Sequence, residues 1–473
     1  HIMKRLKGIM TMLLVVCMVA ALFSGCSKDK DTDANKGSDA PDTITVLAPP
    51  ISANFQAQIP DIQAAFTKKY PNLTLKIEPA SWEDMQTKLD IQVNGGTPPD
   101  IAFMGGANSA IAKYLSTGMM LDISGAISKD ILNDFDANAL TYMKNGNGLY
   151  GLPLYMAIQT IGGNKQYLEE AGIDWKSIQK NGWTFDQFRE LVKKGIKKEG
   201  NATRYGFVFA CSGVTAKDLM LMLSMNAGMS ADFDKNLKYA YTDPNFLKVL
   251  EFVRQLIDDG SMPKNSNTID AGARWNLMLT GQTMITGKGM PVFENSAKKN
   301  NAKLEAKDAS AVKGSVKLDY IQLPLPTLQG SPEVSGGGID GYLTFKQGKE
   351  ADPNHVQNVI KALYFLTSGE WAAKVNSDLF LAQITKTGRD AAKNITTNID
   401  PDNLAMTSKL TAEVFEPRPD ITPDLAAKST KIMTEVMVPK FQALLAGEIT
   451  PQQMYDAVKT AAVAAFGENG IRK

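Results

Sequence analysis

The fold is decided by residues 43–104, which read TITVLAPPISANFQAQIPDIQAAFTKKYPNLTLKIEPASWEDMQTKLDIQVNGGTPPDIAFM. Two short β-branched runs, residues 43–47 and 73–77, predict strands, and the second of them alternates strictly. A nearly all-apolar run at residues 100–104 predicts a third strand, buried on both faces. Prolines and glycines separate these runs from the segments between them.

Two helices are expected between these strands. Residues 59–70 carry apolar side chains at helical spacing and stop at Pro71. Residues 81–84, Ser-Trp-Glu-Asp, match the capping-box pattern at the start of a second helix, which Gly95-Gly96 ends. Strand–helix alternation of this kind predicts parallel βαβ units with right-handed crossovers. The sequence therefore predicts an α/β fold.

The pattern continues with variation over the rest of the chain. About 430 residues follow Asp42, too many for one simple core, so two or more lobes are expected. Glycines punctuate residues 281–289 without a clear period. Further strands are expected at 205–210, 321–325 and 341–345, and further helices at 184–198 with Thr184 as N-cap, from Asp243-Pro244 through Ile257, at 356–366 and at 431–445.

The N-terminus has the layout of an export signal. His1 and Ile2 precede the first Met and are interpreted as a vector-derived remnant. A basic stretch (Lys4, Arg5, Lys7) and an apolar run at 9–23 follow. That run is shorter than the about 20 residues that a membrane span needs. Residues 1–25 are therefore interpreted as a signal peptide.

Residues 23–26, Phe-Ser-Gly-Cys, resemble the bacterial lipobox, in which the cysteine is lipidated; the usual Leu is replaced by Phe23. Cys26 is the predicted lipidation site, and an ordinary signal peptide with an incidental cysteine is the alternative. Residues 26–42 contain no large apolar residue after the cysteine. Such a segment cannot bury enough surface to fold, so a flexible linker is expected.

Composition excludes several classes of function. The formal charge is +1, and removal of the signal peptide leaves 48 basic and 50 acidic residues, so no nucleic-acid partner is predicted. Of the three cysteines only Cys211 belongs to the mature fold, as a small buried filler. One histidine remains there, His355, for which a surface role is expected. A zinc site or a His-based triad lacks its parts, so no metal site is predicted.

Two glycine-rich stretches also do not meet the requirements of the nucleotide-binding motifs that they resemble. Residues 336–341, GGGIDG, match the dinucleotide fingerprint by letter, but a strand follows them and a polar loop precedes them. A flexible turn with close backbone approach is expected there instead. Residues 281–288 have the wrong spacing for a phosphate loop. No cofactor is predicted.

Several segments in order resemble the family 1 extracellular solute-binding proteins, the sugar-binding receptors of ABC importers. The resemblance covers essentially residues 43–466. The segments that carry it are FTKKYPN (66–72), KLDIQVNGGTPPDI (88–101), YLSTGMMLDI (114–123), NGLYGLP (147–153), NK (164–165), WTFDQF (183–188), LPLP (323–326), the glycines 336–338 and GEITPQQM (447–454).

The resemblance implies a two-lobe, periplasmic-binding-protein-like α/β fold with hinge-linked lobes and a central ligand cleft. Residues 43–153 with 327–370 would form the N-terminal lobe, and 154–326 with 371–473 the C-terminal lobe. It implies a non-enzymatic monomer that captures a carbohydrate, expected to be an oligosaccharide, by hinge closure and delivers it to an ABC permease. Lipidation would hold it on the outer face of the membrane, in a Gram-positive cell.

Motif position in the family also implies ligand contacts. The residues expected to meet the ligand are Ser52, Asn54, Trp82, Asn108, Tyr155, Ser212, Trp275, Glu294, Asp340 and Arg418. Trp82 could instead staple its own helix, and Asp340 could merely cap a turn. Trp183 and Trp371 are expected in the core. The loop at 104–108 has no Trp, which departs from the maltose-binding members and argues against a maltose-like ligand.

Two functions of other classes stay open at this point. An extracellular carbohydrate-active enzyme on the same anchor predicts product formation and an essential pair of carboxylates, which one sequence cannot reveal. A surface adhesion lipoprotein predicts neither turnover nor tight ligand binding.

Overall fold

The computed structural model describes residues 39–348, 350–414, 418 and 420–473. The predicted signal peptide, Cys26 and most of the predicted linker lie outside the described residues. Residues 39–473 form one compact unit with two large apolar cores, each built around its own sheet. We call these parts the first and the second lobe.

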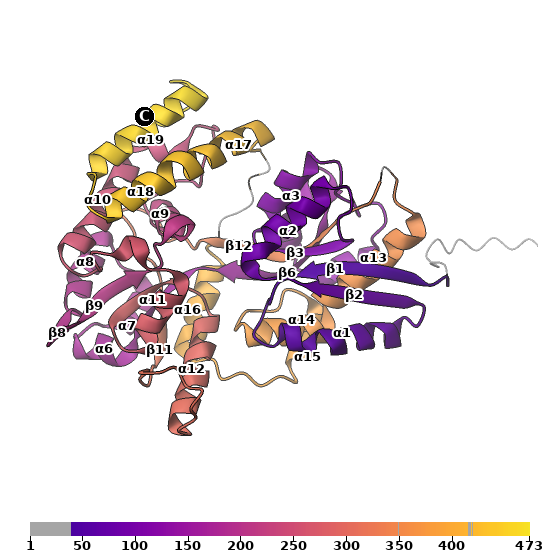
Figure 1. Ribbon diagram of the computed structural model, residues 1–473, viewed down its shortest axis with the longest axis horizontal. Helices are drawn as coiled ribbons and strands as arrows, with labels where there is room; N and C mark the ends of the chain where they lie inside the picture. The colour runs from indigo at the N-terminus through magenta and orange to yellow at the C-terminus, as the bar shows by residue number, and fades with distance from the viewer. Residues whose placement is uncertain (1–38, 349, 415–417, 419) are drawn as a thin grey trace, which may run out of the picture. The chain divides into compact units, whose positions relative to one another are not determined.

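The first lobe holds a five-stranded sheet in the order β2-β1-β3-β12-β6. Strand β1 pairs in parallel with β2 and β3, and β12 is antiparallel to β3 and β6. In Figure 1, α1 lies along one face of this sheet, and α2 and α3 along the other. The strands are β1 (Asp42–Ala48), β2 (Leu73–Pro79), β3 (Ile101–Met104), β6 (Gly151–Ile158) and β12 (Gly337–Thr344).

The elements expected from residues 43–104 are confirmed. Ser81 caps α2 by accepting from the Asp84 amide at 3.0 Å. Helix α1 begins four residues earlier than expected, with Pro60 inside it. The helices are α1 (Phe55–Lys69), α2 (Trp82–Asn94), α3 (Ala107–Leu115), α4 (Lys129–Asp134), α5 (Ala137–Thr141), α13 (Pro353–Thr367), α14 (Gly369–Asp378) and α15 (Lys386–Ala392), with a small hairpin of β4 (Lys144–Asn145) and β5 (Gly148–Leu149).

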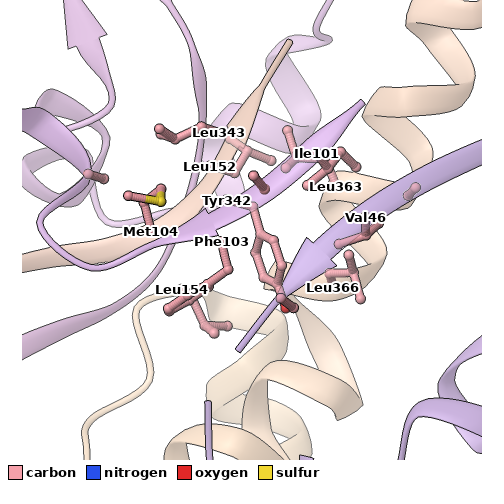
Figure 2. Packing of buried hydrophobic residues seen from close by; sticks show 14 of the residues in the cluster. Val46, Ile101, Phe103, Met104, Leu152, Leu154, Tyr342, Leu343, Leu363 and Leu366 are labelled. Atoms are coloured by element: carbon pink, nitrogen blue, oxygen red, sulfur yellow. The ribbon is translucent and has the colours of Figure 1, made fainter. Parts of the chain in front are cut away.

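The core of the first lobe joins segments far apart in sequence. Val46, Phe103 and Leu154 come from three strands of the sheet, and Leu363 and Leu366 come from α13 (Figure 2). Trp371 and Val375 of α14 belong to the same core. Helix α14, which begins next to the expected boundary after residue 370, thus packs its apolar face on the core of the first lobe. Strand β6 likewise continues beyond residue 153; the expected lobe limits stay a proposal.

The second sheet has the order β11-β7-β10-β9-β8. Strand β10 is parallel to β9 and antiparallel to β7, and β8 forms a hairpin with β9. The glycine-punctuated stretch near residue 285 is thus a strand, which its glycines concealed in the sequence. The strands are β7 (Thr160–Asn164), β8 (Lys197–Glu199), β9 (Ala202–Phe209), β10 (Thr283–Gly289) and β11 (Tyr320–Leu323).

The three helices expected in the second lobe are present, two of them with different limits, and further helices that were not expected lie between them. The helix capped by Thr184 ends at Lys193, because residues 197–199 enter β8, and the helix expected at 431–445 is interrupted by the π-helical turn η4 (Met433–Met437). The helices are α6 (Lys165–Glu170), α7 (Trp175–Asn181), α8 (Phe185–Lys193), α9 (Ala216–Met225), α10 (Pro244–Asp258), α11 (Ala271–Leu279), α12 (Val292–Glu305), α16 (Pro401–Thr411), α17 (Pro423–Ile432), α18 (Val438–Leu445) and α19 (Pro451–Phe466), with 3-10 turns η1 (Gly213–Thr215), η2 (Ala240–Thr242) and η3 (Ser266–Thr268).

The chain crosses between the sheets at residues 158–160 and 324–336, which we call the crossing segments. They run side by side, since the Gln159 amide donates to Gly336 O at 2.9 Å. Met406 and Leu410 of α16 pack with Ile158 beside them. The glycine triplet is not the flexible turn expected from the sequence: residues 337–338 pair with β6 as strand. The expected close approach is real, because a Cβ on Gly337 would lie 2.1 Å from Ala157 O.

Candidate ligand-binding site

The candidate site lies at the carboxyl ends of β1 and β3. The loop after β1 contains Pro50, and Gly105-Gly106 follow β3. Strand β12 is antiparallel to β3 with Gly341 opposite Met104, which brings Asp340 to the same edge. Ligands of open α/β sheets bind beyond the carboxyl ends of the strands.

Asp340 is held at this edge by two donors. Its Oδ1 accepts from the Gly106 amide at 2.9 Å, and its carboxylate is hydrogen-bonded to the Tyr155 hydroxyl. Burial raises the pKa of Asp340, against these two hydrogen bonds. Burial, and then the charge of Asp340, raise the pKa of Tyr155 well above its ordinary value. Tyr155 therefore stays a neutral donor, and Asp340 keeps lone pairs for a further hydroxyl donor.

Trp82 gives the site an aromatic surface. It is the first residue of α2, and its indole Nε1–H donates to Pro50 O at 3.1 Å. One edge packs on Phe103 at a centroid distance of 5.9 Å, yet 44% of the side chain stays exposed. Phe103 also contacts Tyr155, at 6.2 Å. The indole is thus fixed to its own lobe, in line with the alternative role considered for Trp82 in the sequence analysis. It still presents a rigid apolar face.

The other predicted residues of the first lobe differ in their contacts. Ser52 is buried, and its Oγ has no hydrogen-bond partner in the part of the chain that the structure describes. Asn54 donates to both carboxylate oxygens of Asp378 at 3.2 Å, which favours a packing role. Asn108 lies half-buried in the first turn of α3.

In the second lobe, a charged pair was missed by the sequence reasoning. Lys288 Nζ lies 3.3 Å from Asp218 Oδ2, and the positive charge of Lys288 acts to lower the pKa of Asp340. Asp232 is a second missed carboxylate; it has a left-handed backbone at φ 59°, and burial raises its pKa. No motif marks these residues, because their partners come from distant segments.

The predicted residues of the second lobe are engaged elsewhere. Trp275 stacks on Phe293 at 4.7 Å within an apolar cluster. Glu294 is 2% exposed and binds Lys298 Nζ at 2.8 Å and the Asp400 amide at 2.6 Å. Arg418 donates to the carbonyls of residues 233 and 234 and pairs with Asp420. Half-buried Ser212 bonds Ile269 through its backbone. These contacts favour packing roles, and ligand contact by the four residues stays a prediction.

His355 is more than the surface residue expected from the sequence. Its ring nitrogens lie 2.7 Å from Asp42 Oδ2 and 2.8 Å from Asp100 Oδ1. The hydrogen bond to Asp100, and then that to Asp42, raise the pKa of His355 to about 9, against desolvation. The imidazolium therefore clamps the start of β1 to the segment before β3, and the role is structural.

Three further properties of the described residues concern pockets, metal-ligand clusters and membrane-spanning helices. A pocket of about 460 Å³ is lined by the starts of α8 and α10 and by residues 328–331, and none of the predicted ligand residues lines it. Among the described residues, no group of three or more His, Cys, Asp or Glu side chains could hold a metal ion. None of the helices in the described ranges has the length and apolar character of a membrane span.

Comparison with known proteins gives a consistent result. The family model described as bacterial extracellular solute-binding protein matches residues 50–373. A binding protein of Brucella abortus is 22% identical over 316 residues, 66% of this chain and 69% of that protein. The arabinooligosaccharide-binding protein of Bacillus subtilis is 23% identical over 254 residues, 53% of this chain and 54% of that protein.

Solved structures share the fold. A substrate-binding protein of Listeria monocytogenes in complex with cycloalternan has a TM-score of 0.67 at 16% identity, covering 91% of this chain and 99% of that one. The maltodextrin-binding domain of Bdellovibrio bacteriovorus bound to maltotriose has a TM-score of 0.65 at 16% identity, covering 89% and 99%. The predicted two-lobe α/β fold is thereby confirmed.

Proposed function

The chain belongs to the bacterial extracellular solute-binding proteins, and from this we propose that it captures a carbohydrate, an oligosaccharide, and delivers it to an ABC permease. Members of this family and the structural neighbours are binding proteins, which agrees with a non-enzymatic role. The named ligands of the relatives, arabinooligosaccharide, cycloalternan and maltotriose, support the substrate class.

The observation that carries the proposal is the group formed by Trp82, Tyr155 and Asp340. The C–H face of a pyranose or furanose ring packs on an exposed indole, and its hydroxyls need fixed acceptors. Trp82 offers the exposed indole and Asp340 offers the fixed acceptor, at one edge of one sheet. A ligand with both an apolar face and hydroxyl donors fits this combination.

Capture would proceed through relative movement of the lobes. A ligand shifts a conformational equilibrium only by the difference in its affinity for the two states. Contacts from both sheets would supply that difference, and hinge closure would bury the ligand. The closed form would then present the surface that a permease recognises. We expect a monomer for this role.

The anchor is part of the proposal. Cys26 would carry the lipid, and the segment up to residue 42 would tether the lobes on the outer face of a Gram-positive membrane. One acyl chain binds a bilayer marginally, whereas two anchor stably. A tethered receptor stays concentrated near its permease.

Calorimetric titration with a panel of pentose and hexose oligosaccharides tests the function. We expect reversible binding without product formation, together with a rise of the melting temperature. Trp82→Ala should weaken binding by about 2 kcal/mol, roughly 30-fold. Ile91→Ala is the matched control, since Ile91 lies on the same helix and is 67% exposed. Binding of peptides but no carbohydrate, or release of a sugar product, would contradict the proposal.

A further inference from the structure

Two carboxyl side chains meet beside the crossing segments. Glu333 lies on the connection from β11 to β12, and Glu413 follows the last turn of α16. Their backbones are joined, because the Ser335 amide donates to Glu413 O at 3.2 Å and Ser335 forms a parallel bridge with Val414. The end of α16 is therefore fastened to the crossing segment next to the two side chains.

This place touches both lobes. Ser335 Oγ donates to Gln159 O, on the other crossing segment, at 3.3 Å. The Val334 amide donates to Oδ1 of Asn226, the residue that ends α9 in the second lobe, at 2.9 Å. Residues 337 onward enter β12 of the first lobe. A change at Glu333 or Glu413 therefore acts where one lobe connects to the other.

The two carboxyl groups have one nearby cation, Lys409, in the described part of the chain. Glu333 Oε1 and Glu413 Oε2 are buried, and neither has a hydrogen-bond partner among the described residues. The carboxyl groups lie within hydrogen-bond reach of each other. Two carboxylates that share a site cannot both ionise readily, so one of them retains a proton. A shared proton converts two facing acceptors into a donor and an acceptor.

The surroundings offer limited compensation. Lys409 Nζ lies 2.8 Å from Glu333 Oε1, as an ion pair without hydrogen-bond geometry, and also donates to Gln179 O at 2.9 Å. Gly182 packs on Glu333 from the end of α7, where a Cβ would lie 2.8 Å from Oε2. Lys409 is thus the charged group that faces the pair from the described elements. Burial, and then the charge of Glu333, raise the pKa of Glu413 to about 7, against Lys409.

We propose that Glu333 and Glu413 share one proton, and that this protonated pair, which we call the fastener, holds the crossing segments together. Loss of the proton shifts the equilibrium between lobe arrangements. With the proton, the side chains bind each other and hold the end of α16 in the described position. Without it, two negative charges face one lysine and repel. The consequence for ligand affinity rests on the proposed function, whereas the shift of the lobes does not.

Small-angle X-ray scattering of the ligand-free protein between pH 5 and pH 9 tests the inference. The radius of gyration of the wild type should change with a midpoint near neutral pH. Glu413→Gln and Glu333→Gln mimic the protonated group, and both should abolish the change. Glu305→Gln removes the same charge from an exposed position on α12 and should keep it. If Glu413→Gln does not fold, Glu333→Gln still tests the inference.

A pH-independent wild-type curve, or an unchanged transition in both folded Glu→Gln variants, would overturn the inference. Titration with a bound oligosaccharide gives the second readout: the wild-type Kd should differ by about fivefold between pH 6 and pH 8, and Glu413→Gln should remove the difference. A pH response in scattering without carbohydrate binding would leave the fastener intact and remove the proposed function. Carbohydrate binding together with a radius of gyration that does not change with pH would support the proposed function and overturn the fastener.

Discussion

Tyr155 and Asp340 lie opposite each other on the neighbouring strands β6 and β12, and their side chains are hydrogen-bonded at the edge where β3 ends. The pair is held from the other side by the Gly106 amide. It therefore links the sheet, the loop after β3 and the aromatic group around Phe103. A carboxylate fixed in this way meets a ligand without first losing conformational freedom.

The first prediction concerns this pair. Tyr155→Phe removes the donor to Asp340, so the carboxylate becomes less fixed. We expect carbohydrate binding to weaken about tenfold, or about 1.4 kcal/mol, and stability to fall by about 1 kcal/mol. Titration calorimetry and thermal melts measure the two effects. Tyr70→Phe, on a ring at the end of α1, is the control. Equal effects of the two substitutions on ligand affinity would argue against a site at Asp340.

The second prediction concerns the His355 clamp. The folded pKa of His355, about 9, lies above its ordinary value, so the clamp stabilises the fold fully below pH 6.5. This contribution is lost as the pH rises through about 9. His355→Gln should therefore lower the melting temperature at pH 6 and have little effect near pH 10.

The stabilisation of the fold by this clamp is also lost at low pH. The Asn358 and His355 hydrogen bonds lower the pKa of Asp42 against desolvation, so the contribution of Asp42 is present above pH 3.8 and is lost in stronger acid. Lys393→Gln, in an exposed ion pair with Asp390, is the control and should change little at any pH. A His355→Gln effect that is constant from pH 6 to pH 10 would show that packing, and not charge, carries the contribution.

The third prediction concerns the close approach of β12 to β6. Gly337 has φ 148°, and a Cβ there would lie 2.1 Å from Ala157 O. Gly337→Ala should destabilise the protein by about 3 kcal/mol, because two backbones must separate. Gly272→Ala, on the exposed face of α11, should instead stabilise it by about 0.5 kcal/mol. Chemical denaturation measures both. Equal stability of the two variants would mean that the strands separate without cost.

Local patterns predicted the first five elements of the first lobe well, because β1, α1, β2, α2 and β3 are each specified by residues within a few positions of one another. Strand β10 was missed for a physical reason. Its Gly287 is required by close packing, since a Cβ there would lie 2.4 Å from the Phe209 ring. Glycines that serve packing remove the alternation that identifies a strand.

The site was predictable in part. Trp82, Tyr155 and Asp340 follow from positions near strand ends and from the family resemblance, and the structure brings them together. Lys288 with Asp218, and Glu333 with Glu413, could not be inferred, because each pair joins side chains about 70 or more residues apart. Sequence separation of that kind carries no local signal, and only the fold creates the contact.

The last prediction concerns the anchor. The residues of the candidate site belong to the compact unit Asp39–Lys473, whose first strand is β1 (Asp42–Ala48). Cys26→Ala should therefore move the protein from the membrane fraction to the medium while the oligosaccharide Kd stays the same. Cell fractionation and calorimetry measure the two quantities, and Cys211→Ala, which alters the buried thiol, is the control. Retention on the membrane would exclude lipidation at Cys26. Release accompanied by lost binding would show instead that the tether takes part in the site.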